Sequence, residues 1–166
     1  TILYTFDLPY TPQSYLALDA LRRVLSIAYT DSVREEKGGA YGVGVQCEID
    51  KYSNPNALLK IAFRTGPEKY DGLMPIVYRQ LAHVAQGQIN AESIRKIKAY
   101  YKKAHQQEVI LNDYWNTIVY QQLRYGIDMH SNYDALVDQL SAADIQRVAQ
   151  TIIKSNRRIE ITMKSE

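Results

Sequence analysis

Arg34 and Tyr41 are the two side chains in this sequence whose types and spacing point most directly to chemistry. They lie seven residues apart in the segment SVREEKGGAYGVG, residues 32–44. A guanidinium offers a rigid fork of donors and a neutral phenol offers a hydroxyl, a pair that suits the binding of peptide carbonyl oxygens. An ordinary helix-to-strand connection with a surface arginine and a half-buried tyrosine explains the same residues without any function.

The segment around this pair predicts a helical turn followed directly by a strand. Ser32 and Glu35 have the spacing of a capping box, which predicts a short helix with its own start, and the glycine pair at 38–39 predicts its end. Residues 40–50 then alternate as in a half-buried strand. The arginine and the tyrosine should therefore lie at one glycine-lined corner.

The residues beside the pair leave two interpretations open. Gly42 and Gly44 leave one face of the predicted strand without side chains near Tyr41. This could let another backbone approach closely, but a twist or a bulge of the strand explains the two glycines equally well. Glu35 and Glu36 carry carboxylates, yet no metal-binding or paired carboxylate residue is near them in sequence. We interpret both as first-turn helix residues favoured by the helix dipole.

Hydrophobic periodicity along the rest of the chain predicts an α+β domain. Strands are expected at 2–8, 40–50, around 59–63 and at 159–163; helices at 13–29, from 67 to about 86, from 91 onward, around 114–123 and from 142. Asn90 and Ser141 are predicted helix N-caps, and residues 54–56 a turn. Hairpin-adjacent strands and grouped helices favour an antiparallel-rich sheet with helices packed on one face.

Composition is that of one ordinary globular domain, and we take 1–166 as a single domain. The chain has 46% hydrophobic and 23% charged residues and a net charge of +2, so it carries no strong attraction to nucleic acid. Residues 94–103 mix basic side chains with tyrosines, but neighbouring glutamates favour a solvated helix face. No stretch approaches the ~20 apolar residues of a membrane span.

The single cysteine, Cys47, forbids an internal disulfide and leaves the redox compartment undecided. It shares its predicted strand face with Val43, Val45 and Ile49. A buried structural thiol is therefore favoured over a nucleophile.

Four segments resemble the second domain of the pitrilysin/insulinase zinc metallopeptidases, in the family's order along the chain. They are DSVREEKGGAYGV at 31–43, TGPE at 65–68, INAESIRKIK at 89–98 and LSAADIQRVA at 140–149. The first is the specific one. The resemblance implies one of the duplicated α+β domains that pair into a clamshell around substrate. Because the chain begins with Thr1 in mid-strand pattern, we expect it to be part of a longer protein.

The zinc-binding motif of these peptidases, His-x-x-Glu-His, is missing. The three histidines are His83, His105 and His130, and the nearest approach to the motif, His105 to Glu108, continues into Val109, which has no ligand atom. We predict no metal ligand and no cofactor in this chain, with zinc in a partner domain. The isolated chain is then expected to be inactive.

The resemblance implies roles for the opening pair. Tyr41 would donate to the carbonyl oxygen near the scissile bond, and Arg34 would hold a substrate carbonyl or brace the tyrosine. The implied partners are a peptide substrate and a zinc-bearing domain, in the same chain or in a partner subunit. An alternative is a non-catalytic assembly subunit related to the peptidases. Whether the chain associates with itself stays open. Its localisation also stays open; the longer protein to which it belongs could be periplasmic or cytoplasmic in a bacterium.

Overall fold

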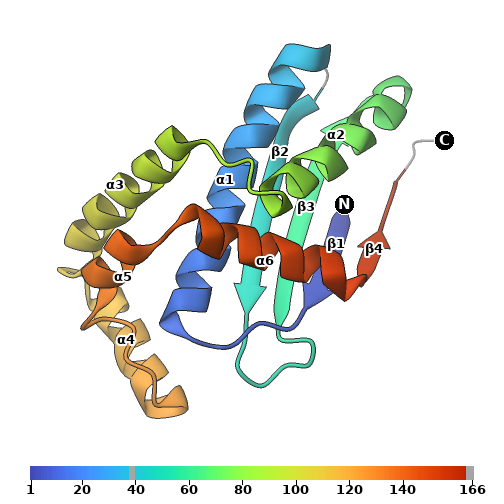
Figure 1. The fold of residues 1–166 in the computed structure, drawn as a ribbon. Coiled ribbons are helices and arrows are strands. Elements are labelled where there is room, and N and C mark those ends of the chain that lie inside the picture. The colour runs from blue at the N-terminus through green and yellow to red at the C-terminus, as the bar shows by residue number, and fades with distance from the viewer. Residues whose placement is uncertain (38–39, 164–166) are drawn as a thin grey trace.

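The computed structural model describes residues 1–37 and 40–163, without the side chains of 33–37, 40–42 and 67. The elements in chain order are β1 (Ile2–Phe6), α1 (Pro12–Lys37), β2 (Ala40–Ile49), β3 (Ala57–Thr65), α2 (Pro67–Ala85), α3 (Ala91–Glu108), α4 (Asn112–Tyr125), α5 (Tyr133–Gln139), α6 (Ala142–Ser155) and β4 (Arg158–Glu160) (Figure 1). The described strands form one four-stranded antiparallel sheet in the order β2-β3-β1-β4.

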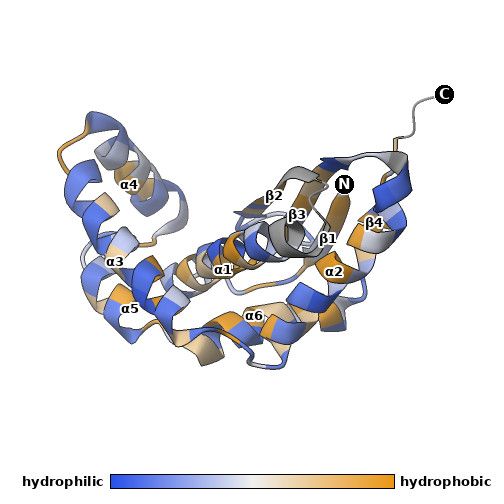
Figure 2. Cartoon of the chain, turned by 90° about the horizontal axis from the view of Figure 1, so that it is seen from above, coloured by the Kyte–Doolittle hydropathy of each residue, from blue (hydrophilic) through white to orange (hydrophobic). Residues whose placement is uncertain are grey.

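Helices α1, α2 and α6 lie on one face of this sheet, and α3, α4 and α5 extend beyond its end (Figure 2). The predicted α+β fold, an antiparallel sheet with helices on one face, is therefore confirmed. The structure also contains the short helix α5, which the hydrophobic periodicity of the sequence did not predict as a separate element. Every helix in the described part of the chain is too short or too polar to span a lipid bilayer.

The core lies between the sheet and α1, as the alternating strand patterns predict. Ile2, Tyr4 and Phe6 of β1 are buried, whereas the residues between them are partly exposed. Leu21 and Leu25 of α1 are fully buried in the same cluster. Burial of each large apolar side chain contributes about 1.5–3 kcal/mol, so this interface supplies much of the stability.

The predicted break between a helix at 13–29 and a separate turn at Ser32 is wrong, because α1 runs unbroken for 26 residues. The Ser32 hydroxyl does not cap a new helix; its oxygen accepts a hydrogen bond from Gln80 Nε2 of α2 at 2.7 Å. One turn earlier the buried Tyr29 hydroxyl donates to the carbonyl of Val77, also in α2, at 3.0 Å. These contacts with α2 stabilise a continuous helix across Ser32, although the local sequence is typical of a helix start.

Asp19 of α1 joins this helix to α3. Its carboxylate accepts hydrogen bonds from Arg22, from Arg23 and from the hydroxyl of Tyr101 in α3, at 2.7–2.8 Å. Burial raises the pKa of the Asp19 carboxyl, but the three donors outweigh burial and hold it below its ordinary value.

The helix ends follow the sequence signals closely. Asn90 caps α3 by accepting from the backbone N–H of Glu92, and Gly126 ends α4 in the left-handed conformation at φ 70°. Ser141 and Asp144 form a full capping box at the start of α6. At the C-terminal side, the strand expected at 159–163 is shorter, because only Arg158–Glu160 pair with β1.

The capping box of α6 predicts a stability loss on mutation. Ser141→Ala leaves the Asp144 backbone N–H without its side-chain acceptor and should lower the free energy of unfolding by about 1 kcal/mol, measured by urea denaturation. Asn132→Ala is the matched control, because Asn132 precedes α5 but makes no side-chain cap hydrogen bond. An equal loss in both variants would contradict the assignment.

Candidate functional site

The structure brings the backbones of Arg34 and Tyr41 to one corner of the molecule. Arg34 is in the last turn of α1 and Tyr41 is the second residue of β2, and these two element ends lie beside each other (Figure 1). Both side chains, together with those of Glu35 and Glu36, lie outside the described residues. The predicted corner is thus present as backbone, and the direction of each functional group stays a prediction.

The end of α1 that carries Arg34 is held firmly by α2. The two hydrogen bonds from Tyr29 to Val77 and from Gln80 to Ser32 lie within five residues of the arginine on its N-terminal side. Tyr29 is fully buried, and burial raises the pKa of its phenol, which therefore stays neutral and able to donate. Sequence periodicity showed α1 and α2 but gave no sign of these cross-links.

A β-bulge stands at the start of β2. Ala40 pairs with Thr65 and Val43 pairs with Phe63, so β2 uses one residue more than β3 over this stretch. Strict alternation was predicted from Tyr41 onward, but it holds only from Val43. Bulges are common beside functional sites because they redirect a side chain. Gly42 within the bulge explains why the strand tolerates it here.

The outer face of β2 beyond the bulge is uncovered. Gly44, Gln46 and Glu48 are all exposed, on the side of the sheet opposite the helices. A Cβ added at Gly44 would lie 3.7 Å from the carbonyl oxygen of Ala62, an ordinary contact. The fold therefore does not require glycine at this position, in contrast to Gly126. Of the two interpretations left open for these glycines, a bulge fits Gly42, and close approach of another backbone at Gly44 stays a prediction.

Cys47 faces the core side of the same strand, where it packs against the main cluster but is only half-buried. Burial, with a further contribution from Asp19, raises the pKa of the thiol to about 11. At neutral pH the thiol is protonated and a poor nucleophile. The structure supports the structural interpretation of this cysteine.

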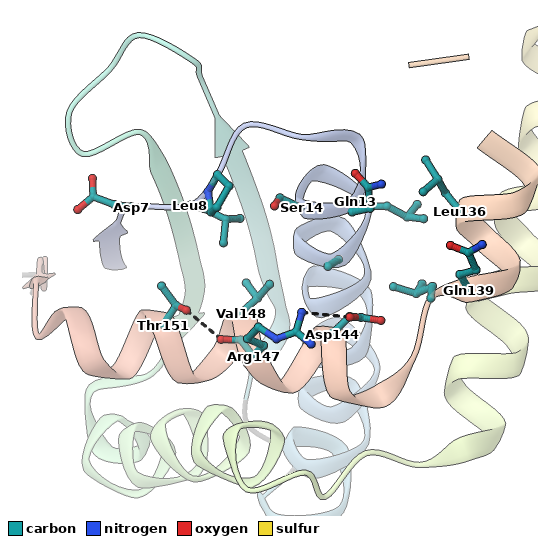
Figure 3. A pocket seen from close by; sticks show the side chains of 14 residues that line it. Asp7, Leu8, Gln13, Ser14, Leu136, Gln139, Asp144, Arg147, Val148 and Thr151 are labelled. Carbon is teal, nitrogen blue, oxygen red and sulfur yellow. Dashed lines mark hydrogen bonds and ion pairs between the residues drawn. The ribbon is translucent and has the colours of Figure 1, made fainter. Parts of the chain in front are cut away.

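The described residues line two cavities, both away from the corner where α1 ends and β2 begins. The larger of the two, about 410 Å³, lies between the β1–α1 loop, the start of α1, α5 and α6, and both polar and apolar side chains line it (Figure 3). Its charged groups are already paired, Asp144 with Arg147 at 3.2 Å and Asp7 with Arg157 at 3.1 Å. The second, about 370 Å³, lies beside Tyr78 and Arg158. The larger cavity holds no nucleophile with an adjacent base.

The histidine that came nearest to the zinc motif is engaged elsewhere. His105 Nδ1 lies 3.2 Å from Asp134 Oδ1, and its Nε2 lies 3.1 Å from the hydroxyl of Tyr114. The same hydroxyl lies 2.7 Å from Nδ1 of His130, so the group joins α3, α4 and the start of α5. Among the described residues no three histidine, cysteine or carboxylate side chains are placed to hold a metal ion.

Comparison with known families identifies the chain. Residues 1–101, which include the whole Arg34–Tyr41 segment, match the family described as "Peptidase M16 inactive domain". The chain therefore belongs to this family of M16 peptidase domains, and the resemblance to pitrilysin/insulinase peptidases is confirmed. No curated protein matches the sequence.

Solved structures show the same fold at low sequence identity. The periplasmic protease PqqL from Escherichia coli is similar with a TM-score of 0.77 and 19% identity, over 92% of this chain but 17% of that one. A protease from Helicobacter pylori is similar with a TM-score of 0.76 and 18% identity, over 95% of this chain and 38% of that one. The inactive peptidase domain of a zinc protease from Bordetella parapertussis is similar with a TM-score of 0.70 and 16% identity, over 99% of this chain and 92% of that one. The chain thus spans less than half of the first two proteins.

The raised pKa of Cys47 predicts slow thiol chemistry. At pH 7.5 the thiolate fraction should be about 100-fold below that of an ordinary cysteine. Because a thiolate of higher pKa is also more nucleophilic, reaction with a small disulfide reagent should be slower in the folded protein by about tenfold or more. The rate is measured with and without urea, and Cys47→Ala gives the blank. Equal rates in the two conditions would mean that the thiol is accessible and activated.

Proposed function

We propose that this domain is the substrate-binding half of a zinc-dependent endopeptidase, and that Arg34 and Tyr41 contact the peptide at the corner where α1 ends and β2 begins. The observation that carries the proposal is the continuity of this corner with the bare strand face at Gly44. An extended peptide can approach the backbone closely at Gly44, with its carbonyl groups beside the corner. Membership of the M16 inactive-domain family supports the same role.

The chemistry assigned to the pair follows from their functional groups. The Tyr41 hydroxyl donates to the substrate carbonyl oxygen and binds it more tightly as negative charge develops there, an effect worth ~3 kcal/mol of barrier for one such donor. Arg34 holds a neighbouring carbonyl with two N–H groups, which the ammonium of a lysine cannot do with the same planar geometry.

Zinc does not fit the described part of this chain, which has no metal-ligating cluster. In this proposal the metal belongs to a separate domain with a His-x-x-Glu-His helix, where it would polarise the scissile carbonyl and activate water. Because ligands and carbonyl donors are then on different domains, hydrolysis requires the two halves to close on the substrate.

The pair is tested in the protein that contains this domain together with its zinc-bearing domain. Tyr41→Phe should lower kcat about 100-fold with KM changed less than about threefold, because the lost donor acts mainly in the transition state. Arg34→Lys should raise KM as well. Tyr52→Phe, at an exposed tyrosine of the β2–β3 loop, is the control and should leave peptide hydrolysis unchanged.

An unchanged kcat in Tyr41→Phe would refute the catalytic assignment. If wild type also cleaves no peptide in the presence of the zinc-bearing domain, the chain is an assembly subunit instead.

The bare strand face gives an independent test. Gly44→Ala should be nearly neutral and Gly44→Val should weaken peptide binding by about tenfold or more, because a larger side chain blocks a close backbone approach. Thermal unfolding of both variants checks the fold, which has room for the Cβ. Full peptide binding by Gly44→Val would show that the substrate does not lie over this face.

A further inference from the structure

Helix α4 contacts the domain mainly along one face, and Trp115 beside this face also packs 4.7 Å from the His130 ring and donates from its indole to the Val109 carbonyl at 2.8 Å. Positions 114, 118, 121 and 125 lie on this face, spaced as one side of a helix. The Tyr114 hydroxyl bonds to both His105 and His130, and Gln121 accepts a hydrogen bond from the Tyr10 hydroxyl at 2.9 Å.

The C-terminal end of the helix is held in the same way. The Tyr125 ring packs 5.3 Å from that of Tyr10, and the Tyr125 backbone carbonyl accepts from Lys51 Nζ at 2.7 Å. These contacts fix the orientation of α4 without burying any of its side chains.

The adjoining face of α4 is apolar and exposed. Leu111, Trp115, Val119 and Leu123 follow one another at four-residue spacing, and their exposed fractions are 53%, 42%, 51% and 82%. Ile110, 80% exposed, lies next to Leu111 in the turn that precedes α4. We call these five residues the α4 ridge. The neighbouring side chains Asn112, Asn116 and Gln122 are uncharged, so no like charges oppose contact with an identical surface.

We propose that the α4 ridge docks against the α4 ridge of a second copy of this chain. A row at four-residue spacing is the ridge used in the commonest helix–helix packing of globular proteins, in which two such rows interdigitate. In an antiparallel pair centred on Val119, the small valines meet at the crossing point. Trp115 of each copy then lies against Leu123 of the other, so large side chains fill the ends.

The area of the ridge agrees with a reversible dimer. At these exposures the five side chains present on the order of 500 Å² per copy, taking about 150–250 Å² for a fully exposed large side chain. Two copies could together bury at most about 1,000 Å² of these side chains, which corresponds to the weak, transient end of the range for specific interfaces. A twofold axis through Val119 makes the interface closed, so association stops at two copies. Helix α4 lies at the periphery of the molecule, which leaves room for a partner (Figure 2).

The first experiment is sedimentation velocity over a concentration series. Wild type should pass from monomer to dimer between about 1 and 500 μM, as mass action requires. Leu123→Glu should remain monomeric over the whole range, because it places two charges in the interface. Thr117→Glu, on the opposite side of the same helix, should dimerise like wild type. Circular dichroism checks that each variant is folded.

A disulfide test locates the axis. In a Cys47→Ala background, Val119→Cys places the two thiols next to each other at the crossing point and should form a covalent dimer on mild oxidation. Thr117→Cys should cross-link at least tenfold more slowly. A wild-type protein that stays monomeric up to 500 μM would overturn the proposal. A dimer that persists in Leu123→Glu, or equal cross-linking at the two positions, would also overturn it.

Discussion

The packing of one unbroken helix, α1, across the sheet is the constraint on which the rest of the structure depends. Its middle fills the core with Leu21 and Leu25, fully buried against the strands. Near its start, Asp19 receives three hydrogen bonds and thereby positions α3. Near its end, Tyr29 and Ser32 are tied to α2. A helix fixed along its length leaves little freedom for the backbone of its last turn, which carries Arg34.

The candidate site inherits this rigidity from both sides. α2 holds the helix end, and β3 holds the strand start through the pairing of Ala40 with Thr65. Within the described part of β2, the pairing with β3 departs from regular register at the bulge before Val43. A site built from a helix end and a strand start is positioned more exactly than one on a free loop, which suits a role in contacting a bound peptide. The open face at Gly44 adjoins these supports without contributing to the core.

Most of the fold could be predicted because its signals are local. Alternation in β1 and the caps at Asn90, Ser141 and Gly126 reflect backbone chemistry within a few residues, and the structure reproduces them. The helix start predicted at Ser32 was wrong because the Ser32 hydroxyl bonds to Gln80, 48 residues away, and no local pattern reveals this contact. The types and spacing of Arg34 and Tyr41 single out the pair in the sequence, whereas the roles predicted for it follow from the family resemblance. The bulge beside it depends on register with β3, which the sequence of β2 alone does not contain.

The pairing of β1 with β4 has a topological consequence. The Thr1 amine and the Ile161 backbone N–H each donate to the other residue's carbonyl at 2.9 Å, so residues 1 and 161 are neighbours in space although 160 positions apart in sequence. A short linker could join them with little loss of stability, since loop closure between adjacent points costs little entropy. The domain is therefore suited to circular permutation, with new ends opened in the exposed turn between β2 and β3, at the opposite end of β2 from the corner proposed to bind substrate (Figure 1).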